Sequence, residues 1–316
     1  MLLKVDELKI VTRELRKLAF DAPPQRIESF VSTALGLSPA EKIVLFPVGD
    51  DLEGLVVGQL TEESEQILKR ETSIPTFAIY EDAFGTWTAA GFGTYLAQRK
   101  FKPDLIERLK NHKEIRKSLL SLAKGHDLEV LGAAILANYC DFGEATRGSG
   151  DQGIDAIGKL NLIQIDAAFY DGGLGSFTVA DPIPGNNVYL LASSKAVLGG
   201  NKADQKVINP AHIRELVGSW LIQRDDIGKW REIGIRMLSP LQLILISTYR
   251  LSDDSINECR KLGIQVWGVP QLIYLICESA PSEVFDPAQG HRFSSSELRK
   301  WWQTKDATRM KLSLGI

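Results

Sequence analysis

Residues 241–278 read LQLILISTYRLSDDSINECRKLGIQVWGVPQLIYLICE and carry the clearest fold signal in the chain. The first residues form a continuously apolar run, as expected of a strand that is covered on both faces. Ser252 then caps a predicted helix, which has two aspartates in its first turn and ends at Gly263. IQVWGV (264–269) predicts a second strand, and PQLIYLICE predicts a second helix. This alternation of strands and helices predicts an α/β sheet covered by helices.

The elements that precede this stretch extend the same pattern. Asn209 is a good N-cap with Pro210 at the first helical position, and an apolar stripe at helical spacing follows. The apolar runs 160–170 and 187–197 predict strands. A helix is predicted over about 125–139, with its apolar residues on one side. Residues 125–278 are therefore predicted to form a series of helices and strands, in which the strands can pair in one sheet.

A short glycine-rich segment joins that helix to the strands. Residues 148–155 read GSGDQGID, with three glycines and two aspartates among eight residues. Glycine adopts backbone angles closed to other residues and lets another backbone or a ligand come close. A carboxylate delivered by Asp155 at such a place can bind a metal, cap a helix or close a turn. Its neighbours Asp151 and Gln152 are interpreted as turn residues.

Taken together, residues 125–278 resemble the Mrr-like branch of the PD-(D/E)xK restriction endonuclease superfamily. The resemblance covers about half the chain. Its most specific parts are the SGDQGID turn and the pair HIRELVGSW and LISTYRLSDD…CRKLGIQ. It implies an α/β fold with a restriction-endonuclease-like core, in which a mixed sheet is flanked by helices. It implies nothing about residues 1–98.

The resemblance also implies a Mg²⁺-dependent nuclease. In the pattern of this family Asp155 binds Mg²⁺, Lys195 is the catalytic lysine, and Glu129 reaches the metal, usually through water. Hydrolysis of a phosphodiester requires charge neutralisation at the phosphate and an activated water, both of which Mg²⁺ supplies. A nearby lysine can stabilise the developing charge or orient the water. The glycines beside Asp155 would leave room for the nucleic-acid backbone.

One position departs from the family pattern in a way that touches the metal. Ser193 stands two residues before the lysine, where the family usually has Glu or Gln. A serine hydroxyl is a poorer ligand than a carboxylate for a hard cation. Some related restriction enzymes have serine there and recruit a glutamate from a neighbouring helix. Glu129 or Glu215 could serve that purpose here.

The long separation between the aspartate and the lysine is a second departure. It requires residues 169–187 to be an insertion, and a shifted alignment would make Asp166 the metal ligand instead. Taken singly, Asp155 is a turn residue, Lys195 a solvated strand-end lysine and Glu129 a helix residue that points to water. Their order along the chain favours a metal site: Glu129 comes first, then the glycine-rich turn that ends in Asp155, and then the strand that carries Lys195.

Charge is unevenly distributed along this acidic chain, whose formal net charge is −3. Residues 99–117 carry eight Lys and Arg against three acids, and residues 291–311 carry six against two. Such segments fit a polyanionic partner on one face, although solvated helix faces have the same composition. Both segments are candidates for phosphate contacts, and the tail also contains Trp301 and Trp302. The predicted DNA-binding residues are Lys100, Lys102, Arg147 and Arg214.

The predicted domain order follows from these observations. Residues 1–98 form an N-terminal α+β domain for recognition or regulation, with a helix starting at Thr61 and strands at 42–48 and 76–80. A basic helical connector spans 99–124, the nuclease-like domain 125–280, and a basic helical tail 281–316.

Composition narrows the cellular setting. At 316 residues, 44% hydrophobic and 24% charged, the chain is ordinarily globular, and no apolar run approaches a membrane span of about 20 residues. Three cysteines, Cys140, Cys259 and Cys277, are too few and too irregular for a disulfide framework. We therefore expect a cytoplasmic protein without a membrane partner.

The function expected from the resemblance is a restriction-type endonuclease that cuts double-stranded DNA in defence against foreign DNA. Because each active site cuts one strand, a homodimer on a two-fold symmetric sequence is expected. Two alternatives stay open: a non-catalytic DNA-binding or regulatory protein on a degenerate nuclease scaffold, and a nuclease switched on by a ligand at the N-terminal unit. Ser193 in place of the acid favours the first alternative.

Overall fold

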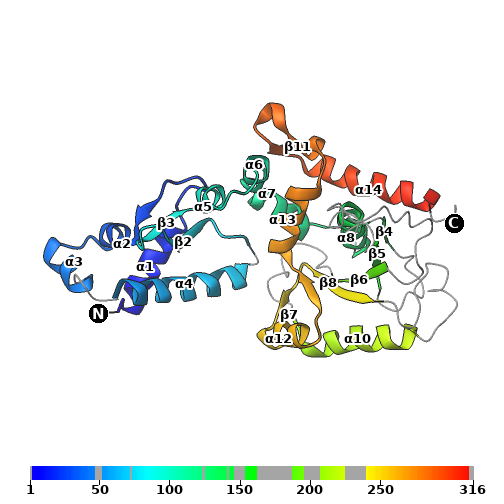
Figure 1. Ribbon diagram of the computed structural model, residues 1–316, viewed down its shortest axis with the longest axis horizontal. Coiled ribbons are helices and arrows are strands. Elements are labelled where there is room, and N and C mark those ends of the chain that lie inside the picture. Colours follow the sequence, from blue (N-terminus) through cyan, green and yellow to red (C-terminus); the bar gives the residue numbers. More distant parts are fainter. Residues whose placement is uncertain are drawn as a thin grey trace, which may run out of the picture. The chain divides into compact units, whose positions relative to one another are not determined.

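The computed structural model describes residues 2–46, 52–71, 73–122, 125–140, 142–145, 154–161, 187–195, 207–224 and 240–312. The fold is mixed α/β (Figure 1). It divides into two units: an N-terminal unit of residues 1–113 with 287–293, and a C-terminal unit of residues 114–286 with 294–316. Each unit has a sheet and helices of its own, and the boundary falls inside helix α7 (His112–Leu120).

The N-terminal unit packs helices against a small antiparallel sheet of order β1-β3-β2. Its strands are β1 (Gln25–Arg26), β2 (Phe77–Glu81) and β3 (Trp87–Gly91). Its helices are α1 (Val5–Leu15), α2 (Ile27–Leu35), α3 (Pro39–Leu45), α4 (Leu52–Glu71), α5 (Phe92–Gln98) and α6 (Pro103–Leu109). Val11, Leu15, Ile27, Val31 and Leu60 are fully buried in its core.

The strand predicted at 42–48 is wrong, because the chain forms helix α3 there. Ser38 accepts a hydrogen bond from the backbone of Glu41, and the Glu41 carboxylate accepts one from the backbone of Ser38. This capping box, with Pro39 at the first helical position, fixes a helix start. The apolar run itself is only partly used, since Ile43 and Val44 are exposed.

Two further boundaries differ from the prediction. Helix α4 begins at Leu52, well before the predicted start at Thr61. Within the predicted basic connector, α6 ends at Leu109, and α7 begins at His112. The strand predicted at 76–80 is confirmed as β2.

The C-terminal unit is built on a five-stranded mixed sheet of order β10-β8-β6-β5-β4. Strands β6, β8 and β10 run parallel, β5 is antiparallel to β6, and β4 is antiparallel to β5. The strands are β4 (Phe142–Ala145), β5 (Ala156–Asn161), β6 (Asn187–Lys195), β8 (Leu241–Ser247) and β10 (Gln265–Trp267). A two-stranded sheet pairs β7 (Val207–Ile208) with β9 (Arg250–Leu251).

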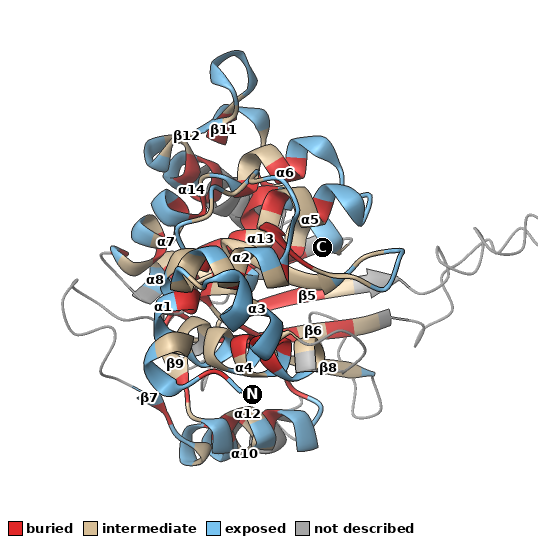
Figure 2. Cartoon of the chain, turned by 90° about the vertical axis from the view of Figure 1, so that its left-hand side faces the viewer, coloured by how far each residue is buried: buried red, intermediate tan, exposed pale blue. Residues whose placement is uncertain are grey.

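Helices cover both faces of the five-stranded sheet, so the mixed sheet flanked by helices is confirmed. Helices α10 (Pro210–Arg224) and α12 (Asp253–Lys261) pack on one face, where Ile213, Leu216 and Cys259 meet Leu245 of β8. Neighbouring strand residues point to opposite faces, so Ile246 faces the other layer. There it meets helix α8 (Gly125–Tyr139) at Gly132. Figure 2 shows buried residues along β5 and β6.

Helix α8 lies unusually close to the sheet because glycines remove side chains at the contact. A Cβ at Gly143 of β4 would come 2.4 Å from the Ala137 nitrogen, and one at Gly158 of β5 would come 2.8 Å from the Cys140 sulfur. Backbone therefore packs directly against backbone at Gly143, and α8 side chains pack against the bare backbone at Gly158. Helix α13 (Val269–Ser279) joins this layer through Tyr139, whose hydroxyl donates to the Glu278 carboxylate.

The chain ends in short elements and helix α14 (Ser295–Leu312). The short elements are η2 (Ser282–Val284), β11 (Phe285–Asp286), η3 (Pro287–Gln289) and β12 (Arg292–Phe293). Trp301 and Trp302 of α14 are buried, with 8% and 2% exposed. Their burial packs this end of the helix into the C-terminal unit.

Among the residues that the structure describes, none of the helices combines the length and the apolar character needed to cross a bilayer.

Candidate metal and catalytic site

The start of one strand and the ends of two others meet at one edge of the five-stranded sheet. Strand β6 ends at Lys195, which pairs with Ser247 at the end of parallel strand β8. Strand β5 runs the other way, and Asp155 directly precedes its first residue, Ala156. Carboxyl ends of parallel strands are where open α/β sheets commonly bind ligands. Asp155 and Lys195 therefore lie at the same edge, on neighbouring strands.

Two hydrogen bonds fix Asp155 against β6. Its backbone N–H donates to the carbonyl of Ala192 at 2.8 Å. Its carboxylate Oδ2 accepts a hydrogen bond from the backbone N–H of Ser194 at 2.5 Å. The carboxylate thus lies beside the peptide that precedes Lys195. Charge-assisted hydrogen bonds of this kind hold a carboxylate in one orientation.

The main chain of Lys195 is also held, while its side chain is exposed. Its carbonyl accepts hydrogen bonds from the backbone N–H of Thr248 at 3.1 Å and from the Ser247 hydroxyl at 3.5 Å. The exposed Lys195 side chain therefore starts from a fixed main chain, at the same edge of the sheet as Asp155.

Two serines occupy the positions before the lysine. Ser193, where a carboxylate was expected from the family pattern, is 2% exposed. The hydroxyl of Ser194 is buried and has no hydrogen-bond partner in the part of the chain that the structure describes. A buried hydroxyl without a partner is uncommon and marks a place where a further polar group can be accommodated.

Glu129 belongs to the helix layer behind this edge. It precedes Gly132 by one helical turn, so the two residues lie on the same side of α8. Gly132 contacts Ile246, and Ile246 pairs with Ser194 in the sheet. Glu129 is therefore carried toward the end of β6. Its carboxylate accepts a hydrogen bond from the Nδ1 of His126 at 2.9 Å, and its side chain is 21% exposed.

The other predicted residues are spread more widely. Arg214 and Glu215 are exposed on α10, beside the buried Ile213 and Leu216 that anchor the helix. Lys100 and Lys102 are exposed in the N-terminal unit, before α6. Four residues lie outside the described part of the chain: Arg147, Asp151, Gln152 and Asp166.

The donor atoms at the edge are oxygens, from the Asp155 carboxylate and a serine hydroxyl. Ser193 and Ser194 are neighbours in β6, so their hydroxyls point to opposite faces of the sheet and only one of them can share an ion with Asp155. Hard cations such as Mg²⁺ prefer oxygen ligands and need only one or two carboxylates when waters complete the shell. Over the described residues, no three His, Cys, Asp or Glu side chains gather as a metal cage would require. An oxygen donor such as the Asp155 carboxylate is the ligand type that Mg²⁺ prefers.

Sequence reasoning did not anticipate how Asp155 is oriented. The acceptor–donor pair of Asp155 and Ser194 depends on the register between β5 and β6, which is non-local. Ser247 and Thr248, which fix the main chain of Lys195, were also missed. The only sequence signal for them is the change from apolar to hydroxyl residues at the end of the run 241–248.

Comparison with known proteins gives no match: no family model, curated protein or solved structure matches this chain.

Proposed function

We propose that the protein is a Mg²⁺-dependent endonuclease that hydrolyses phosphodiester bonds of double-stranded DNA. One observation carries the proposal: the carboxylate of Asp155 and the strand-end Lys195 lie together at one edge of a mixed sheet. Apart from the short strands β4, β7 and β9, the element order of residues 125–279 is also that of the resemblance, with helix, Asp, strand, strand with Lys, capped helix and strand.

In this proposal Asp155 would hold the metal directly, and Glu129 would reach it through water. Bound Mg²⁺ would neutralise charge on the phosphate and lower the pKa of a water ligand. The hydrogen bond from Ser194 keeps the Asp155 carboxylate in place without help from the metal. The oxygen-only donor set supports Mg²⁺ as the ion.

Lys195 would act on the substrate. Its exposed ammonium can stabilise the charge that develops on the phosphate, or orient the water that attacks it. A duplex with two strands to cut would require two such sites, so a homodimer is part of the proposal. The biological role would be restriction-type defence against foreign DNA in the cytoplasm.

The test is cleavage of supercoiled and phage DNA by the purified full chain, with Mg²⁺ or with chelator. Discrete fragments that require the metal, and that disappear in Lys195→Ala, support the proposal. The matched control is Lys261→Ala, which removes an exposed lysine from α12 of the same unit. Metal-independent binding of DNA without any cutting counts against it.

A second candidate is a DNA-binding protein on a degenerate nuclease scaffold. Ser193 favours it, because a buried hydroxyl replaces the carboxylate that would share the metal. This candidate predicts a gel shift of duplex DNA that is equal in Mg²⁺ and in chelator, with no product. Restoration of cutting by Ser193→Glu in an otherwise inactive protein would identify the missing group.

A further inference from the structure

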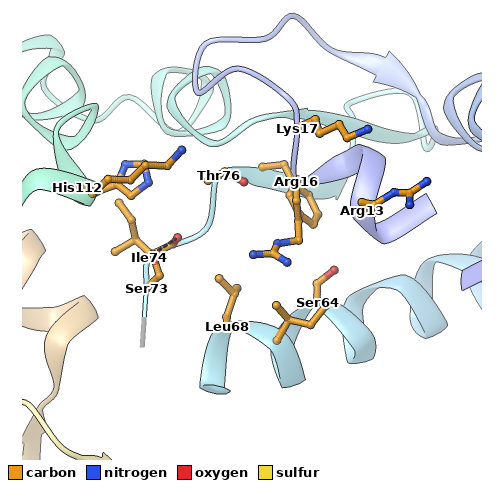
Figure 3. Close-up of a pocket in the computed structure, with 12 residues that line it drawn as sticks. Arg13, Arg16, Lys17, Ser64, Leu68, Ser73, Ile74, Thr76 and His112 are labelled. Carbon is orange, nitrogen blue, oxygen red and sulfur yellow. Dashed lines mark hydrogen bonds between the residues drawn. The ribbon is translucent and has the colours of Figure 1, made fainter. Parts of the chain in front are cut away.

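A pocket of about 310 Å³ lies within the N-terminal unit, and none of its lining residues belongs to the proposed nuclease site (Figure 3). Its walls come from the end of α1, the middle of α4, the segment that leads into β2 and the first residues of α7. Pockets for small ligands span about 300–1,000 Å³, so this one suits a ligand at the small end of that range.

The pocket carries an excess of positive charge. Its lining contains four cations, Arg13, Arg16, Lys17 and Lys113, and no acidic residue among the lining side chains that the structure describes. Glu14 lies next to two of them: it accepts hydrogen bonds from Lys17 at 2.8 and 3.0 Å and pairs with the Arg13 Nε at 3.4 Å. Glu14 itself is not part of the lining, so the described side chains that line the pocket are cationic, polar or apolar, and a lining of this kind attracts an anion.

The directions of the side chains distinguish these cations. Arg13 and Lys17 point away from the pocket, whereas the guanidinium of Arg16 extends into it, above Leu68 and Ser64 of α4 (Figure 3). A guanidinium presents a planar fork of N–H donors that matches phosphate or carboxylate oxygens. Arg16 is therefore the group that would contact the anion.

The floor of the pocket is apolar. Ile74 is 6% exposed, and Leu68 and Phe77 are half-buried beside it. One wall is held rigidly, because His112 is buried, donates its Nδ1–H to the Leu109 carbonyl at 3.1 Å, and stacks on Phe20 with ring centroids 5.8 Å apart. A preformed apolar floor suits the ring of an organic ligand. Inorganic anions have no such ring.

Hydroxyl groups add a further preference. Ser64 donates its hydroxyl proton to the Leu60 carbonyl at 2.6 Å, and Ser73 donates to the Ile74 carbonyl at 3.3 Å. Both serine oxygens keep lone pairs, so they can accept hydrogen bonds from a ligand. Sugar hydroxyls are donors of this kind. The Arg16 cation thus matches a phosphate, the serine hydroxyls match a sugar, and the apolar floor matches a ring.

We propose that this pocket binds a small phosphorylated nucleoside of the nucleoside monophosphate class. Arg16 contacts the phosphate, with Lys113 as the second cation; Ser64 and Ser73 accept from the sugar; and Leu68, Ile74 and Phe77 cover the base. The binding site goes beyond the proposed nuclease function and does not depend on it.

The test is isothermal titration of the full chain with AMP, GMP, CMP and UMP, each beside its nucleoside and beside inorganic phosphate. At least one monophosphate should bind, and its nucleoside should bind at least roughly tenfold more weakly because it lacks the charge-assisted contact. Arg16→Ala should weaken binding by roughly tenfold or more, and Arg16→Lys by less. Lys9→Ala, which removes an exposed cation from the same helix outside the pocket, should leave binding unchanged.

The proposal is overturned if none of the four monophosphates binds, or if wild type and Arg16→Ala bind the nucleotide equally well. It is also overturned if inorganic phosphate binds as tightly as the best nucleotide. Binding of oligonucleotides alone would likewise contradict a small-ligand pocket. Asp155→Ala should bind the nucleotide normally, so failure of the nuclease assignment and failure of this one give different results.

Discussion

The carboxylate of Asp155 accepts a hydrogen bond from the backbone N–H of Ser194 at 2.5 Å, which places it one residue from Lys195. The two residues are far apart in sequence, and the β5–β6 pairing brings them to the same sheet edge. This hydrogen bond gives Asp155 a structural role in addition to the proposed metal-binding one. The two roles can be separated by substitution.

Asp155→Asn keeps an oxygen acceptor for the Ser194 N–H, whereas Asp155→Ala removes it. Loss of a partner for a part-buried donor costs about 1–3 kcal/mol, so the alanine variant should be less stable than the asparagine variant. Urea unfolding of the two proteins measures this difference. Equal stability would mean that the hydrogen bond contributes nothing.

Glu129→Gln tests whether the α8 carboxylate acts on the metal. The amide keeps the shape of the side chain and can still bond His126, but it has no charge. Groups that act through a metal-bound water typically change activity by about 10–100-fold, so Mg²⁺-dependent cleavage should fall by that factor. Glu114→Gln, an exposed glutamate of α7, is the control. Wild-type cleavage by Glu129→Gln would remove Glu129 from the site.

Gly143→Ala should destabilise the C-terminal unit. A Cβ there would lie 2.4 Å from the Ala137 nitrogen and 2.6 Å from the Ala133 carbonyl oxygen, so backbone must move. Overpacking of this kind costs about 1–3 kcal/mol. Gly218→Ala in α10 is the matched comparison, because a Cβ there meets nothing within 4 Å. That change should stabilise by about 0.5–1 kcal/mol. Thermal unfolding that shifts both variants in the same direction would contradict this packing.

Tyr139 makes stability depend on pH at the alkaline end. Burial, and then the hydrogen bond to Glu278, raises the pKa of Tyr139 to about 12, above its usual value of about 10. The folded state thus favours the protonated phenol. The contribution of Tyr139 is fully present below pH 10 and is lost as pH rises toward 12.

The measurement is the free energy of unfolding across this alkaline range, in wild type and in Tyr139→Phe. The phenylalanine variant cannot ionise at this position, so its stability should fall less steeply above pH 10. Identical slopes for the two proteins would show that Tyr139 does not titrate as the packing of α8 against α13 requires.

Regular patterns in the sequence predicted the elements of residues 241–278 well. The apolar run at 241–248, the cap at Ser252 and the stop at Gly263 correspond to β8 and α12. These signals are local, so they survive in any tertiary context. Residues 42–48 failed because an apolar run alone does not distinguish a strand from a helix, and the capping box at Ser38 decided the outcome.

The candidate site was predictable only as a list of residues. Asp155, Lys195 and Glu129 follow from the family pattern, but their mutual placement depends on strand register and on the close approach of α8 at Gly132. The short strand β4 was missed because its four residues, FGEA, have no alternating pattern. The cationic pocket was also missed, because its residues come from four separate segments.

The central claim is tested most directly by scoring nicks and breaks in a supercoiled plasmid, with Mg²⁺ present, for wild type and Asp155→Asn. We predict that wild type cuts, that chelator stops it, and that the stably folded asparagine variant loses cleavage by about 100-fold or more. Asp254→Asn, which changes an exposed carboxylate of α12, should cut like wild type. Full cleavage by Asp155→Asn would contradict the assignment of this edge of the sheet as the catalytic centre.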